Sequence, residues 1–68
     1  MRIQISIRNE FGEYIGETYE IDDSQYENIK NLSKTFYESG FELVDESGNF
    51  FVFPPDIVKK SILKISIK

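Results

Sequence analysis

The side chains of this sequence that could do chemistry are carboxylates, hydroxyls and amines, because the chain has neither histidine nor cysteine. That composition removes triads built on imidazole or thiol groups, disulfides and nearly every zinc geometry. Two carboxylates could act as acid and base, but glycosidase-type chemistry needs them across a sugar-sized cleft, which a chain of 68 residues rarely builds. We therefore predict a protein that is not an enzyme and that holds no cofactor and no metal.

Glu17 is the carboxylate that the strand pattern directs inward. Residues 3–7 alternate isoleucine with polar side chains, which predicts a strand with one buried face. If the turn that follows places Asn9 opposite Glu13, the returning strand directs Glu17 inward, beside Gly16. This pattern indicates a β-bulge or an inward charge that protects an exposed edge. The alternative is a carboxylate held in a cleft, although nothing nearby in sequence offers it a catalytic partner.

Asp45, Ser47 and Asn49, with Asp56 further on, have an oxygen spacing similar to that of a calcium loop. The glycine lies at the wrong position for such a loop and a bidentate glutamate is missing. A hairpin turn over residues 45–49 explains the same side chains, so we predict a turn and no metal site.

A helix is predicted between the two turns. Asp22 is placed as an N-cap and Gln25 completes a capping box, while Gly40 marks the end. The apolar residues between them recur at spacings of three and four, as expected for one helical stripe: Tyr26, Ile29, Leu32 and Phe36.

Residues 41–44 and 50–53 are predicted to form a second hairpin in which Leu43 faces Phe51 and Phe41 faces Phe53 on the helix side. Three apolar residues then lie on the opposite face, where one helix cannot cover them, and the register of the first hairpin places Tyr14 on that side too. These four residues form the predicted uncovered face: Tyr14, Val44, Phe50 and Val52.

Pro54-Pro55 ends the second hairpin and opens a short helical turn, with Ile57 and Val58 covering one end of the core. Residues 63–67 alternate again and are predicted to pair beside the first strand. The predicted fold is a single α+β domain over residues 1–68, a small antiparallel sheet with one amphipathic helix packed on one face, in the order β-β-α-β-β-β.

The charges are unevenly distributed along the chain. Twelve acidic and eight basic residues give a formal charge of -4. Residues 9–29 hold seven acids and no base, whereas residues 57–68 hold four lysines and no acid. The first residues alternate from the start, which is not the pattern of a signal peptide, and no apolar run approaches membrane-spanning length. We expect a cytoplasmic location and no membrane partner.

Our first hypothesis is a small acidic protein-binding module that forms a homodimer. It would act as an inhibitor or adaptor, for example one that a mobile element encodes against a host nucleic-acid-processing or defence protein. Its contacts would come from the uncovered face and from the acidic first hairpin, where carboxylates could occupy sites meant for phosphates. The predicted partner-binding residues are Tyr14, Val44, Phe50, Val52, Glu13, Glu17 and Glu20.

The alternative is a domain that binds single-stranded nucleic acid. An aromatic side chain on a sheet face could stack on a base while lysines follow the phosphates. The residues for that role are Phe50, Lys59, Lys60, Lys64 and Lys68. The competing interpretation of these lysines is a solvated edge that balances the acidic hairpin.

Overall fold

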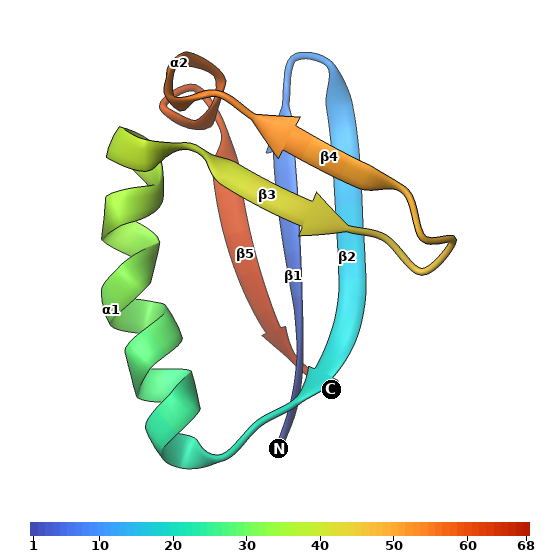
Figure 1. Ribbon diagram of the computed structural model, residues 1–68, viewed down its shortest axis with the longest axis vertical. Helices are drawn as coiled ribbons and strands as arrows, with labels where there is room; N and C mark the ends of the chain where they lie inside the picture. The colour runs from blue at the N-terminus through green and yellow to red at the C-terminus, as the bar shows by residue number, and fades with distance from the viewer.

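The first hairpin and the last strand form a three-stranded antiparallel sheet in the computed structural model, which describes residues 1–68 (Figure 1). Its strands are β1 (Arg2–Asn9), β2 (Gly12–Glu20) and β5 (Ile62–Ile67), in the order β2-β1-β5. The alternation of β1 buries Ile3 and Ile7 completely. Ile5 faces Ile65, so the predicted pairing of the last strand with the first is confirmed.

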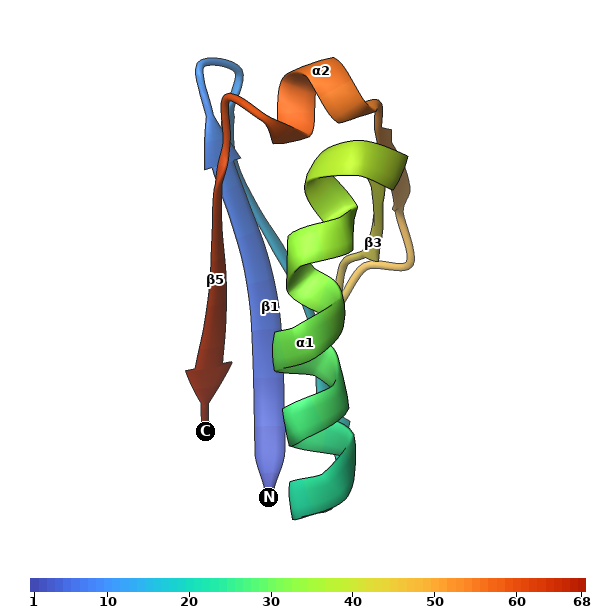
Figure 2. The ribbon, with the colours of Figure 1, turned by 90° about the vertical axis from the view of Figure 1, so that its left-hand side faces the viewer.

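A second layer covers one face of this sheet (Figures 1 and 2). It consists of α1 (Asp23–Ser39) and the hairpin of β3 (Phe41–Val44) and β4 (Phe50–Phe53). The short helix α2 (Pro55–Val58) closes one end between the two layers. The predicted α+β class and the order β-β-α-β-β-β are confirmed. The second hairpin does not join the first sheet, however, and the five strands form two antiparallel sheets.

The register of the first hairpin differs from the prediction near its turn. Asn9 pairs with Gly12 across a two-residue loop, and the N–H of Phe11 donates to Asn9 Oδ1 at 2.9 Å. Ile7 therefore pairs with Tyr14. The predicted register, with Asn9 opposite Glu13 and a three-residue loop, would pair Ile7 with Ile15 instead. The bulge predicted at Gly16 is present, because the register shifts between Gln4 and Ser6. Beyond this shift Ile3 pairs with Tyr19, which is the pairing that follows from placing Asn9 opposite Glu13.

Gly16 lets the second layer approach the sheet at this bulge. A Cβ atom on Gly16 would lie 2.9 Å from the carbonyl oxygen of Ile5 and 3.4 Å from side-chain atoms of Leu43. The side chain of Gln4 donates to the carbonyl oxygen of Gly16 at 2.9 Å, so the bulged backbone keeps a hydrogen-bond partner. The bulge is thus a contact point between the two layers.

The core between the layers is small. Ile7, Leu43, Phe53 and Val58 form its buried cluster, to which β1, β3, β4 and α2 each contribute one side chain. Half-buried side chains surround this cluster: Tyr14, Phe36, Phe41, Phe51, Ile57 and Leu63. The predicted role of Ile57 and Val58 at one end of the core is confirmed.

Helix α1 begins and ends where the sequence predicts. The N–H of Gln25 donates to Asp22 Oδ1 at 2.8 Å, and the N–H of Asp22 donates back to Gln25 Oε1 at 2.9 Å. At the other end the N–H of Gly40, with φ 87°, donates to the carbonyl oxygen of Phe36. The predicted stripe is wrong at one position: Leu32 is 54% exposed, and Ser33 is the half-buried residue of that turn.

Replacing Gly16 with alanine should destabilise the protein, because the new methyl group would push against backbone on one side and Leu43 on the other. We expect the free energy of unfolding to fall by about 1–3 kcal/mol in urea denaturation, the usual cost of overpacking. Thr18→Ala on the same strand is the control, with a smaller loss. An unchanged unfolding midpoint for Gly16→Ala would contradict the close approach of the layers at the bulge.

Candidate functional site

The β3–β4 hairpin has one face that builds the core and one face that meets solvent. Leu43 and Phe53 are buried, and the ring of Phe51 lies 5.1 Å from that of Tyr14. The alternate residues Phe50 and Val52 are 60% and 63% exposed. In Figure 1 the hairpin lies in front of the three-stranded sheet, so these residues are on the side away from the sheet.

Cross-strand pairing brings the outward residues of the hairpin together. Val44 is paired with Phe50, and Glu42 is paired with Val52. We call the surface made by these four residues the outer hairpin face. It contains three of the four residues predicted to form an uncovered apolar face, and the register that predicted it is confirmed in full.

Tyr14 does not belong to the outer hairpin face, which corrects the prediction. Its ring packs 5.1 Å from the rings of both Phe51 and Phe53, between the layers. The physical reason is the two-residue turn of the first hairpin, which pairs Tyr14 with buried Ile7. Ile15 points to the open face of the sheet instead and is 47% exposed.

A shallow groove borders the outer hairpin face where α1 ends. Its volume is about 630 Å³, and it runs between the last turn of α1 and the hairpin. Glu42 and Val52 belong to both the groove and the outer hairpin face, while Thr35, Ser39 and Pro55 lie along its other sides. Val52, one of the two outward side chains of β4, thus stands beside a recess that could accept a side chain of a partner.

The acidic residues predicted to bind a partner lie along β2, an edge strand of the three-stranded sheet. In the register of the hairpin Glu13 is opposite Arg8 and Glu20 is opposite Arg2. Glu17 lies at the bulge and is half-buried. By alternation Glu13 and Glu20 lie on the open face of the sheet, away from the outer hairpin face, whereas Glu17 falls on the covered side with Tyr19.

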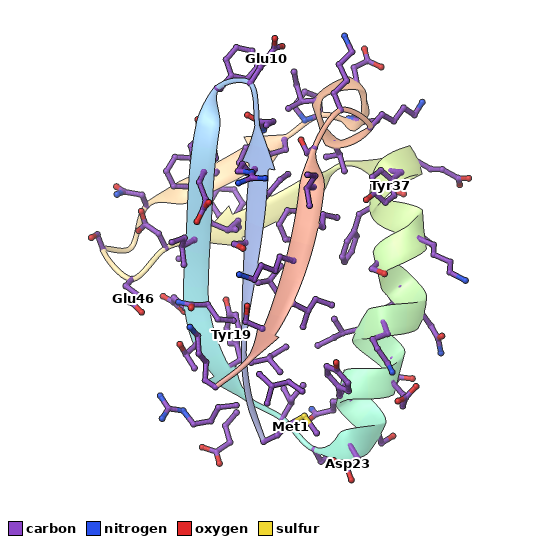
Figure 3. All side chains as sticks on the ribbon, turned by 180° about the vertical axis from the view of Figure 1, so that it is seen from behind. Met1, Glu10, Tyr19, Asp23, Tyr37 and Glu46 are labelled. Atoms are coloured by element: carbon purple, nitrogen blue, oxygen red, sulfur yellow. The ribbon has the colours of Figure 1, made fainter.

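The lysines of the nucleic-acid alternative are not brought next to Phe50. Lys64 pairs with Ser6 on the open face, which Figure 3 shows from the side opposite to Figure 1. The same alternation puts Lys68 on that face, whereas Phe50 lies on the far side of the hairpin layer. Lys59 and Lys60 follow α2 at one end of the molecule. Phe50 and these lysines therefore do not form one continuous surface.

Asp45 organises the turn of the second hairpin. Its Oδ1 accepts the backbone N–H of Asn49 at 2.9 Å and that of Ser47 at 3.0 Å, and its Oδ2 accepts the side-chain amide of Asn49 at 3.1 Å. The backbone hydrogen bond from Asn49, with the others, holds the pKa of Asp45 below its usual value. Asp45, Ser47 and Asn49 thus use their polar groups to hold the hairpin turn together. No group of three or more acidic side chains is placed to hold a metal ion.

Lys30 is the other group whose pKa departs from its usual value. Its ammonium group lies 3.0 Å from a carboxylate oxygen of Glu27, one turn earlier on α1. The hydrogen bond and the charge of Glu27 raise the pKa of Lys30. The spacing of three residues brings the two side chains together on the helix surface.

The sequence interpretation missed a cavity of about 220 Å³ between α1 and the three-stranded sheet. Leu32 was assigned to the inner stripe, although Ser33 follows Ile29 by four positions and fits the same helical spacing. The small side chain of Ser33 leaves space that leucine would fill. The lining comes from both layers and includes one charged residue, Lys30: Ile5, Leu63 and Ile65 with Tyr26, Lys30, Ser33, Phe36 and Tyr37.

No protein-family model, characterised protein or solved structure matches this chain. Neither α1 nor α2 has both the length and the apolar character that crossing a bilayer requires. The function proposed below therefore depends on the geometry of the chain itself.

The lowered pKa of Asp45 predicts a pH-dependent contribution to stability. Because the fold favours the carboxylate, this contribution is present above the pKa of Asp45 in the unfolded chain and is lost as the pH falls through the lower, folded pKa. In thermal unfolding the melting temperature of the wild type should exceed that of Asp45→Asn at neutral pH. This difference in melting temperature should close as the pH is lowered into the acid range. Glu46→Gln, one residue away and exposed, is the control and should show no such gap. A gap for Asp45→Asn that is constant with pH would refute this assignment.

Proposed function

We propose that this protein is a small acidic, non-catalytic protein-binding module whose contact surface is the outer hairpin face. The observation that supports this proposal is the exposure of Phe50 and Val52 side by side on a strand whose other residues fill the core. Grouped exposed apolar side chains, rimmed by polar ones, are typical of interaction sites.

The fold itself does not need apolar side chains at these two positions. Phe51 and Phe53 supply the contacts of β4 with Tyr14, and Phe53 also stacks on Phe41. The outward positions of the same strand could carry threonine and keep its strand propensity. Two large apolar side chains in water are better explained by a surface that is covered part of the time.

A second copy of the chain is the partner that we propose for this face. Twofold symmetry would bring Phe50 and Val52 of one copy against the same residues of the other. Stable interfaces bury roughly 800 Å² on each partner, more than two side chains provide. The groove between α1 and the hairpin would then be part of the interface, with Glu42 and Pro55 at its sides.

An inhibitor or adaptor role follows from the acidic composition, and we place it in the cytoplasm. Glu13, Glu17 and Glu20 lie along the free edge of β2. Carboxylates along an edge would attract a basic protein surface, such as one that normally meets nucleic acid, and speed its association. This edge leaves the outer hairpin face free to hold the two copies together.

The test is sedimentation of the wild type and of Phe50→Asp over a range of concentrations. We expect the wild-type mass to rise towards a dimer and Phe50→Asp to stay monomeric, with an unfolding midpoint close to wild type because Phe50 is exposed. Phe11→Asp is the matched control, since Phe11 is 65% exposed at the turn of the first hairpin. A wild type that is monomeric at every concentration, or a Phe50→Asp variant that still dimerises, would sink self-association through this face.

A further inference from the structure

Helix α1 extends past the edge of the three-stranded sheet instead of lying over its centre. In Figure 1 the helix lies beside β5, on the side away from β1. Figure 2 shows that it belongs to the second layer, together with the β3–β4 hairpin. The edge of β5 therefore lies open beside the apolar stripe of the helix. No side chain of α1 is fully buried, and the cavity of about 220 Å³ lies between this stripe and Leu63 and Ile65 of β5.

The backbone of β5 has unpaired groups along this edge. The N–H of Lys68 donates to the carbonyl oxygen of Arg2 at 2.8 Å, in the register that pairs Ile5 with Ile65. Hydrogen-bonded positions alternate along an antiparallel strand. Leu63, Ile65 and Ile67 therefore direct their N–H and C=O groups away from β1. Because β5 is the last strand of the sheet, those groups point to its free edge.

The two faces of β5 differ in chemistry. Leu63 and Ile65 line the cavity on the α1 side, while Lys64 and Lys68 alternate with them on the open face. Residues 57–68 carry four lysines and no acid. A second copy of β5 would bring the same lysines to the edge, whereas a strand with acidic residues on that face would complement them.

We propose that the β5 edge binds an extended peptide segment of a partner protein, one that alternates apolar and acidic side chains. The segment would add a fourth strand beside β5, with its backbone paired to Leu63, Ile65 and Ile67. Its apolar side chains enter the cavity under α1, and its carboxylates face Lys64 and Lys68. This site is separate from the outer hairpin face and does not depend on dimerisation there.

The experiment is a titration of ¹⁵N-labelled protein with a short synthetic peptide of alternating glutamate and valine, blocked at both ends. Bound peptide should shift the amide signals of Leu63, Ile65 and Ile67 and slow their hydrogen exchange, because those amides acquire hydrogen-bond acceptors. The amides of Phe50 and Val52 should not move. A peptide with lysine in place of glutamate is the control and should bind more weakly.

Two kinds of variant test the geometry and the charge separately. Ile67→Pro removes an N–H that points to the free edge and leaves the bonds to β1 in place, so peptide affinity should fall by roughly tenfold, about the effect of one lost hydrogen bond. Ile67→Ala is its control and should keep most of the affinity. Lys64→Glu should also weaken binding, while Lys34→Glu, an exposed position on α1, should not.

Three outcomes would overturn the proposal. One is equal binding of the glutamate and lysine peptides, and another is an affinity that neither Ile67→Pro nor Lys64→Glu changes. The third is slow exchange of the Leu63, Ile65 and Ile67 amides in a dimer of the protein alone, because a second copy would then be the occupant of this edge. If Ile67→Pro does not fold, the peptide affinities of Lys64→Glu and Lys34→Glu still test the proposal: a loss of affinity in Lys64→Glu alone supports it, and equal affinities overturn it.

Discussion

The contact of the β3–β4 hairpin with the bulge at Gly16 is the constraint on which the rest of this structure depends. Leu43 lies so close to Gly16 that a Cβ atom there would meet it at 3.4 Å. This approach lets Phe51 and Phe53 reach the ring of Tyr14. Because side chains alternate along a strand, the same packing turns Phe50 outward. The exposed apolar face is therefore a direct consequence of how the core is built.

The position of the hairpin also explains why the helix is loosely packed. The hairpin lies over β1 and β2, so α1 is displaced towards β5 and beyond it (Figures 1 and 2). Its apolar stripe is consequently only half-buried, with a cavity beneath it. A chain of this size has too little apolar surface to cover every face. The surfaces left open include the outer hairpin face and the β5 edge, and we assign a binding role to each of these two.

Local signals in the sequence predicted most of the fold. The capping box at Asp22, the helix end at Gly40 and the whole register of the second hairpin are confirmed. Tyr14 was misplaced because a two-residue turn and a later bulge offset one another, and residue types near a turn do not determine the loop length. Leu32 was predicted on the inner stripe where Ser33 is found, because the rotation of a helix about its axis is set by tertiary packing. Which strands share a sheet is likewise a non-local property, so the division into two sheets was missed.

Alanine substitution at each position of β4, with both unfolding and self-association measured, tests the central claim most directly. If one face of β4 builds the core and the other binds, Phe53→Ala should lower the free energy of unfolding by about 3–5 kcal/mol, the usual cost of losing a buried ring. Phe51→Ala should cost less than Phe53→Ala, because its ring is half-buried, but clearly more than the exposed positions. Phe50→Ala and Val52→Ala should leave that free energy nearly unchanged and weaken association. Equal losses of stability at Phe50 and Phe51, or association unaffected at both exposed positions, would contradict the account.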